Sequence, residues 1–258
     1  MTKATAAKAR ALVRPIAHRG LHDQSRGIIV NTLSAFEAAI AKGYGIECDL
    51  RPARDLEPMV FHDDTLDRLT EGQGNVRGFT PAELERTAMK HTKDRIPRLS
   101  DLLDLVAGRV PVLIEIKSDW ENGNSGIEAA FAEQIAARLK SYRGPFGLMS
   151  FDPRRIAPFV HLLPDAPVGL VAGGTRSDAG MPAWIKRWPA ARLLDNAIMR
   201  PDFLAYWVRG LPSAATALSK RPKSMPLFTW TVRSDADQTM AARYADAMIF
   251  EGFEPVQP

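Results

Sequence analysis

Short apolar runs alternate with amphipathic stretches along the whole chain. The runs hold four to seven residues each, which suits buried strands, and the stretches between them repeat apolar residues at helical spacing. This alternation predicts an α/β protein with a parallel sheet and helices packed against it. The nine strand candidates are Pro15–His18, Gly45–Leu50, Pro58–His62, Pro111–Lys117, Phe146–Phe151, Val168–Ala172, Arg192–Asp195, Leu227–Val232 and Ala247–Glu251.

The spacing of the second and third candidates decides the topology. Only Arg51–Glu57 separates them, which leaves no room for a crossover helix, so the two strands must be antiparallel. We therefore interpret Gly45–Leu50 and Pro58–His62 as a hairpin that brings His62 back level with Glu47.

Eight parallel strands remain once the returning strand of the hairpin is set aside. That number predicts a (β/α)8 barrel of the TIM type. We expect one domain over residues 1–258, with a small hairpin-bearing insertion after the second strand, at residues 51–98. A helix over Lys3–Leu12 should cover the bottom of the barrel. Capping residues place further helix starts at Thr32 or Ser34, Ser100, Ser125, Asp152 and Asp235.

The composition is that of an ordinary globular protein. The chain has 258 residues, 45% of them hydrophobic and 25% charged, and its single cysteine allows no disulfide framework. The first 20 residues are basic but lack the apolar run of a secretory signal. No segment reaches the roughly 20 apolar residues that span a bilayer. We expect a soluble cytoplasmic protein without stable membrane insertion.

The net charge of +4 is dispersed along the chain. There is no long run of Lys or Arg and no interleaving of basic with aromatic residues, which argues against a nucleic-acid partner. Basic groups near a site would still attract a small anionic substrate. The pattern does not indicate an oligomeric state.

Charged side chains end several of the predicted strands, where barrels of this type carry their active sites. Glu47 and Asp49 are two residues apart, so both face the barrel mouth while Cys48 between them faces the helices. Glu115 and Lys117 follow the same rule. Three carboxylates in one mouth repel each other, and one divalent cation, Mg²⁺ or Ca²⁺, would relieve that repulsion. A ring of Glu–Lys and Asp–Arg ion pairs is the alternative.

Two histidines at predicted strand ends flank these carboxylates. His18 and His62 suit a general base and a general acid, because an imidazole titrates near neutral pH. Arg19 offers a planar fork for phosphate oxygens, and Lys117 adds a second positive charge. The combination predicts hydrolysis of a phosphate ester at a metal ion.

Three further residues are open to interpretation. Trp230 either packs outward under helices or points into the mouth, where it would stack on an alcohol group. We interpret His22 as a loop residue, because Gly20 disfavours a helix there. We interpret Glu251 as a solvated charge near the C-terminus.

These motifs resemble those of the glycerophosphodiester phosphodiesterases. The resemblance runs over most of the chain, dense up to Lys117 and thin between Phe151 and Leu227. Each element alone is weak, but their order and spacing are jointly specific. The elements are Ala17-His18-Arg19-Gly20, Asn31-Thr32, Ala35-Phe36, Gly43, Glu47-Cys48-Asp49, Val60-Phe61-His62-Asp63, Leu66, Arg68, Ile96-Pro97, Leu99, Glu115-Ile116-Lys117, Ser150-Phe151 and Trp230-Thr231-Val232.

The resemblance implies a fold, a reaction and a set of roles. The fold would be the phosphodiesterase version of the TIM barrel. Family members hydrolyse deacylated phospholipids, such as glycerophosphocholine and glycerophosphoethanolamine, to an alcohol and sn-glycerol 3-phosphate. The implied roles are an acid/base pair, a set of ligands to one Mg²⁺ or Ca²⁺, and substrate contacts: His18 and His62; Glu47, Asp49 and Glu115; Arg19, Lys117 and Trp230.

Some features depart from the family and leave alternatives open. The last strand commonly ends in Thr-Asp, whereas here it reads Phe250-Glu251. One alternative is a phospholipase D-like or cyclising phosphodiesterase acting on lysophospholipids or sphingolipids, with Met181, Trp184 and Trp188 as an apolar lip. An alternative of another class is a non-catalytic protein that binds phosphodiesters on a decayed enzyme fold.

Overall fold

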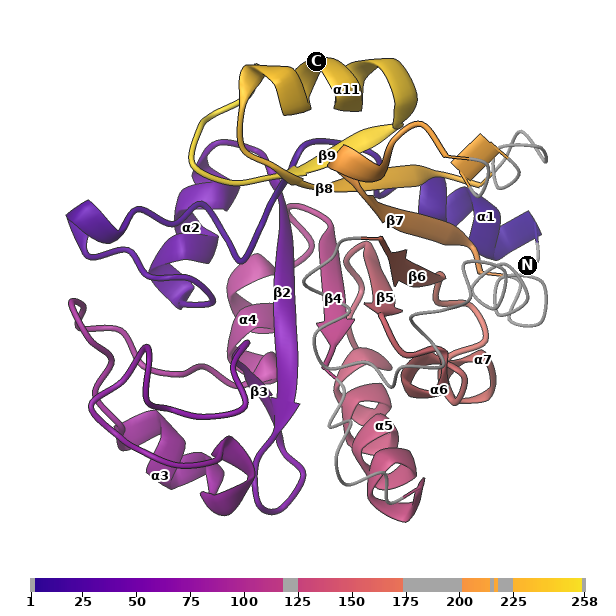
Figure 1. The fold of residues 1–258 in the computed structure, drawn as a ribbon. Helices are drawn as coiled ribbons and strands as arrows, with labels where there is room; N and C mark the ends of the chain where they lie inside the picture. Colours follow the sequence, from indigo (N-terminus) through magenta and orange to yellow (C-terminus); the bar gives the residue numbers. More distant parts are fainter. Residues whose placement is uncertain (1–2, 118–124, 174–200, 214–215, 218–224, 257–258) are drawn as a thin grey trace.

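A closed barrel of parallel strands forms the centre of the computed structural model (Figure 1). The strands follow the order β1-β9-β8-β7-β6-β5-β4-β2, and pairing of β1 with β2 closes the ring. This arrangement confirms the predicted (β/α)8 barrel of the TIM type. The strands are β1 (Ile16–Ala17), β2 (Gly45–Pro52), β4 (Val112–Ile116), β5 (Phe146–Ser150), β6 (Val168–Ala172), β7 (Phe203–Trp207), β8 (Leu227–Val232) and β9 (Ala247–Phe250). The structure describes residues 3–117, 125–173, 201–213, 216–217 and 225–256.

The seventh strand differs from the prediction. β7 is Phe203–Trp207, and it pairs directly with both β6 and β8. It therefore takes the place in the barrel that we expected Arg192–Asp195 to fill; the latter segment lies outside the described residues. Phe203–Trp207 is a short continuous apolar run, and periodicity alone does not distinguish such a run from a buried helical segment.

The predicted hairpin is present and carries the returning strand outside the barrel. β3 (Pro58–Val60) pairs antiparallel with β2, with Leu50 opposite Val60. Beyond the strand, the Phe61 N–H donates to the Asp49 carbonyl oxygen over 3.0 Å. Continued by one residue, this register sets His62 level with Cys48, which is one residue away from the predicted position at Glu47.

The segment after the hairpin builds a small core of its own beside the barrel (Figure 1). It contains the 3₁₀ turn η2 (Val76–Gly78) and helix α3 (Pro81–Arg86), which a Thr80–Glu83 capping box begins. The organisation of residues 1–258 as one domain remains a prediction. The buried members of this core are Ile29, Ala53, Met59, Phe61, Leu66, Val76, Leu84, Met89 and Ile96.

Helices cover the outer face of the barrel, with α2 packed on β2 and on α4, and α11 packed on β8 and β9 (Figure 1). Thr32 caps α2 by accepting from the Ala35 N–H, and Asp152 caps α6 by accepting from the Arg154 N–H. None of the described helices is long and apolar enough to cross a membrane. The expected cytoplasmic location remains a prediction.

Besides α3 and η2, the described helices are α1 (Lys3–Arg10), α2 (Leu33–Ala41), α4 (Leu99–Val106), α5 (Ser125–Leu139), α6 (Pro153–Ile156), α7 (Phe159–Leu162) and α11 (Asp235–Tyr244), with 3₁₀ turns η1 (Gln24–Arg26) and η3 (Val208–Gly210).

The N-terminal segment closes the bottom of the barrel, as predicted. Ala9 and Leu12 are fully buried in the apolar cluster that fills the barrel interior, together with Phe203 and Phe228 from the strands. Because the interior is packed from below, the charged groups at the other end of the strands face an open mouth.

Replacing Leu12 with alanine should lower the free energy of unfolding by about 2–5 kcal/mol, because the side chain is fully buried and its removal leaves a cavity. Urea unfolding would measure the loss. Val256→Ala, at a side chain 92% exposed, is the matched control and should leave stability unchanged. A Leu12→Ala variant as stable as the control would contradict the proposed closure.

Candidate active site

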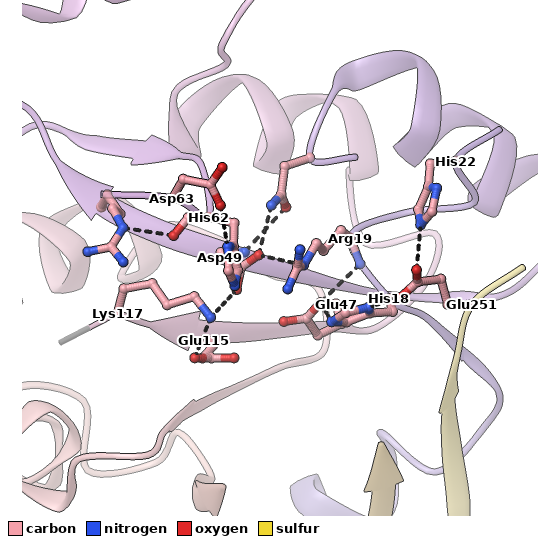
Figure 2. Close-up of polar contacts among 12 residues, drawn as sticks. His18, Arg19, His22, Glu47, Asp49, His62, Asp63, Glu115, Lys117 and Glu251 are labelled. Carbon is pink, nitrogen blue, oxygen red and sulfur yellow. Dashed lines mark hydrogen bonds and ion pairs between the residues drawn. The ribbon is translucent and has the colours of Figure 1, made fainter. Parts of the chain in front are cut away.

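Three carboxylates gather on two neighbouring strands of the barrel (Figure 2). Glu47 and Asp49 lie on β2 and Glu115 on β4, and the strand register sets Asp49 directly beside Glu115. Cys48 is buried in the outer core between strands and helices, as strand alternation predicted. All three carboxylates are themselves buried.

Two cations lie among these carboxylates. Lys117 Nζ is 2.7 Å from Asp49 Oδ1 and 2.6 Å from Glu115 Oε1 (Figure 2). Arg19 Nε is 3.2 Å from Asp49 Oδ2. Although burial opposes ionisation, the neighbouring cations, Lys117 first, hold the pKa of Asp49 well below its usual range. The ring of ion pairs considered as an alternative is therefore present around Asp49.

The neighbouring cations compensate the charge of Glu47 only in part. Its Oε2 accepts from the Arg19 backbone N–H at 3.0 Å, but its buried Oε1 makes no hydrogen bond with the residues that the structure describes. Burial, followed by the charges of Asp49 and Glu115, raises the pKa of Glu47 well above its usual range. An additional positive charge beside Glu47 would therefore stabilise its ionised form.

The donor set fits one divalent cation. Glu47, Asp49 and Glu115 each offer an oxygen, and the three atoms lie within 4.8 Å of one another. Mg²⁺ and Ca²⁺ prefer oxygen ligands of this kind. The residues present can therefore hold such an ion.

Each candidate catalytic histidine turns its Nδ1 toward a carboxylate. His18 Nδ1 is 2.7 Å from Glu251 Oε2, and His62 Nδ1 is 2.7 Å from Asp63 Oδ1. An ionised carboxylate only accepts hydrogen bonds, so Nδ1 carries the hydrogen in both rings and Nε2 is left for other partners. Burial lowers the pKa of both histidines, to about 4 for His18.

A left-handed turn after β1 aims Arg19 at two of the carboxylates. Arg19 has φ 57° and Gly20 has φ 84°. A Cβ on Gly20 would lie 2.8 Å from the carbonyl carbon and Cβ of Ala35, so glycine alone fits the turn. From this turn the Arg19 backbone reaches Glu47 and its guanidinium reaches Asp49.

Gly20→Ala should therefore lower both stability and activity. The left-handed backbone alone costs about 1–2 kcal/mol for a residue with a Cβ, and the contact with Ala35 adds to it. Thermal unfolding and turnover would measure the two losses. Gly78→Ala is the matched control, since a Cβ there meets no atom within 4 Å. Equal behaviour of the two variants would contradict this account of the turn.

Asn31 holds Asp49 and was not singled out as a site residue from the sequence. It is buried with φ 59°, a conformation that asparagine tolerates better than most residues. Its Nδ2 donates to Asp49 Oδ2 at 2.8 Å, and the Asp49 N–H donates to its Oδ1 at 3.3 Å. The available signal was an asparagine directly before the capping Thr32 without a capping role of its own.

A cavity of about 670 Å³ opens at the barrel mouth, and His18, Arg19, His62 and Lys117 are among the residues that line it. Trp230 points into it rather than outward under the helices; its Nε1 donates to the Ala205 carbonyl at 3.1 Å and its ring meets Phe151 edge to face. One wall of the cavity is therefore apolar and the other is charged. The residues of the apolar wall are Met149, Phe151, Val171, Trp230 and Ile249.

Glu251 is not the solvated charge that the sequence analysis expected. Its side chain is 24% exposed and bonds both His18 and Arg233. His22 lies in a loop, as predicted, with Nε2 4.0 Å from Glu251 Oε1. Pairing of β1 with β9 brings positions 18 and 251 together, which no local sequence pattern shows.

The fold and the site define a barrel with the groups of a phosphoester hydrolase. Residues 18–252 match the model of the glycerophosphoryl diester phosphodiesterase family, and the chain belongs to that family. It is therefore an enzyme, a phosphoric diester hydrolase, and the resemblance drawn from the motifs is confirmed.

Individual relatives agree with the family assignment. The chain is 28% identical to "Glycerophosphodiester phosphodiesterase" of Caldanaerobacter subterraneus subsp. tengcongensis, with 86% of each chain covered. It is 40% identical to "Probable glycerophosphodiester phosphodiesterase 1" of Mycobacterium tuberculosis, covering 74% of this chain and 80% of the relative. An Oleispira antarctica phosphodiesterase, solved in complex with the product sn-glycerol-3-phosphate, superposes with a TM-score of 0.75 at 20% identity, over 94% of each chain.

Proposed function

We propose that this enzyme hydrolyses glycerophosphodiesters, such as glycerophosphocholine and glycerophosphoethanolamine, to an alcohol and sn-glycerol 3-phosphate. One observation carries the proposal: His18 and His62 line the same cavity as Glu47, Glu115 and the cations beside them. Family membership supports the reaction class, and the product bound by the Oleispira antarctica enzyme supports the identity of the phosphate product.

The chain supplies both charge and orientation to the substrate phosphate. Arg19 and Lys117 line the cavity and are held by Asp49, so their donors are fixed before the substrate binds. Glu47, Asp49 and Glu115 would hold the divalent cation, which when bound polarises the phosphate and offsets its charge.

The two histidines would move the protons. One accepts at Nε2 the proton of the attacking oxygen, which forms a new bond to phosphorus. The other donates a proton from Nε2 to the leaving alkoxide as the bond from phosphorus to the alcohol oxygen breaks. Their Nδ1 bonds to Glu251 and Asp63 hold the rings for this exchange. Trp230 on the apolar wall would pack against the carbon atoms of the alcohol.

Two coupled assays test the proposal: one for sn-glycerol 3-phosphate and one for the released head-group alcohol, because cleavage of an acylated substrate at the same bond frees the alcohol but no sn-glycerol 3-phosphate. A panel of glycerophosphodiesters and their lyso-acylated counterparts would be assayed in EDTA and with Mg²⁺, Ca²⁺ or Mn²⁺. We expect release from deacylated substrates only with a divalent ion. Preference for acylated substrates would instead support the phospholipase D-like alternative, whose lip at Met181, Trp184 and Trp188 lies outside the described residues. Binding without turnover under every condition would contradict the proposal.

A further inference from the structure

The two histidines of the site have matching supports. His62 bonds to Asp63, and Asp63 accepts two hydrogen bonds from Arg68, at 2.6 and 2.9 Å. On the other side of the carboxylate cluster, His18 bonds to Glu251, and Glu251 accepts from Arg233 Nη2 at 2.7 Å. Each imidazole therefore hydrogen-bonds to a carboxylate, and an arginine side chain in turn hydrogen-bonds to that carboxylate.

The support of His18 comes from the far end of the chain. Glu251 follows β9 and Arg233 follows β8, while His18 follows β1. The Glu251 N–H donates to the Val232 carbonyl and the His18 N–H donates to the Phe250 carbonyl. These backbone bonds set the carboxylate and the ring at a fixed separation before any substrate is present.

The surroundings of Glu251 keep its carboxyl group ionised. Burial opposes ionisation, but the hydrogen bonds from His18 and Arg233 outweigh it and lower the pKa of this carboxyl. The His22 imidazole lies nearby, with its Nε2 4.0 Å from Glu251 Oε1. Figure 2 shows Glu251 between His18 and His22, on the opposite side of His18 from Glu47.

We propose that Glu251 is a positioning residue for His18, and that Arg233 acts through Glu251. By accepting the Nδ1 hydrogen, Glu251 keeps the His18 ring in the tautomer whose Nε2 is unprotonated and turned toward the cavity, where it lies 3.9 Å from Glu47 Oε2. The proposal rests on the catalytic role proposed for His18. It also assigns a role to Glu251, which the sequence analysis interpreted as a solvated charge.

Substitutions at Glu251 can separate positioning from simple structural support. Gln at this position keeps the length and an acceptor oxygen for His18 and Arg233, while Ala keeps neither. Glu251→Ala should lower kcat by about 100-fold and Arg233→Ala by about 10-fold, the usual range for partners that orient an active group. KM should change little, because the phosphate contacts are proposed for Arg19 and Lys117. Glu251→Gln should recover most of kcat. Glu254→Gln, at a side chain 52% exposed, is the matched control.

A spectroscopic measurement without metal or substrate completes the test. Long-range ¹H–¹⁵N correlation spectra of histidine-labelled protein in EDTA, with His18 assigned by comparison with His18→Ala, report the tautomer of the ring. The wild type and Glu251→Gln should show hydrogen on Nδ1, and Glu251→Ala should show a mixture with the Nε2–H form. An Nε2–H tautomer in the wild type, or wild-type kcat in Glu251→Ala, would overturn the proposal. If the wild type hydrolyses no diester, the proposed function fails, and the spectra still decide whether Glu251 positions the ring.

Discussion

His62→Ala is expected to lower kcat by about 1,000-fold, within the range for loss of a general acid or base. The free energy of unfolding should hardly change, because the His62 side chain is 30% exposed and belongs to neither the barrel interior nor the outer core. His18→Ala should lose a similar factor. Since the two rings serve one reaction, the double variant should lose little more than the more damaging single variant.

Steady-state kinetics with glycerophosphocholine, together with thermal unfolding, would measure these effects. His161→Ala is the matched control, because His161 lies exposed on α7, away from the cavity. Near-wild-type kcat in both single variants would contradict the assignment of the acid/base pair, as would losses that simply multiply in the double variant.

The second large effect is expected at Glu47. Glu47→Gln keeps the shape of the side chain and an acceptor for the Arg19 N–H, but removes a carboxyl whose ionised form the buried surroundings disfavour. In EDTA the variant should be at least as stable as the wild type, because an amide at this buried position costs no ionisation and repels neither Asp49 nor Glu115. Its activity with Mg²⁺ should fall by about 1,000-fold, since a bound metal is worth several kcal/mol to the transition state.

Thermal unfolding with and without Mg²⁺ or Ca²⁺ gives a readout that does not depend on turnover. A ligand at 100 times its Kd stabilises the folded state by about 2.7 kcal/mol. The wild type should show a metal-dependent rise in Tm, and Glu47→Gln should show little or none. Glu254→Gln, which alters an exposed carboxylate, should behave as the wild type. An equal metal-dependent rise in the two variants would contradict a metal site at Glu47.

Features that depend on local geometry were predictable from the sequence. The period-two alternation of a strand turns Glu47 and Asp49 one way and Cys48 the other, whatever the rest of the fold. The short connection Arg51–Glu57 forces an antiparallel pair, and β2 and β3 form one. The exact register was not predictable, because the turn within that connection sets it, and the actual pairing differs by one residue.

Features that depend on the closing of the barrel were not predictable. Glu251 looks like a terminal surface charge until β9 pairs with β1 and places it against His18. Asn31 acquires its role only because a left-handed backbone directs its amide at Asp49. The Phe203–Trp207 strand was missed because periodicity alone does not distinguish a short apolar run in a buried strand from one in a buried helical segment.

The central claim is that this enzyme converts a glycerophosphodiester to a phosphomonoester with His18 and His62 as its proton-transfer groups. A ³¹P NMR time course of glycerophosphocholine with the metal-loaded enzyme tests it most directly, because the diester and monoester phosphorus signals are distinct. We predict that the wild type replaces the diester signal by that of sn-glycerol 3-phosphate, whereas His18→Ala and His62→Ala leave the diester intact over the same period. An unchanged diester signal with the wild type, or equal conversion by all three proteins, would contradict the account.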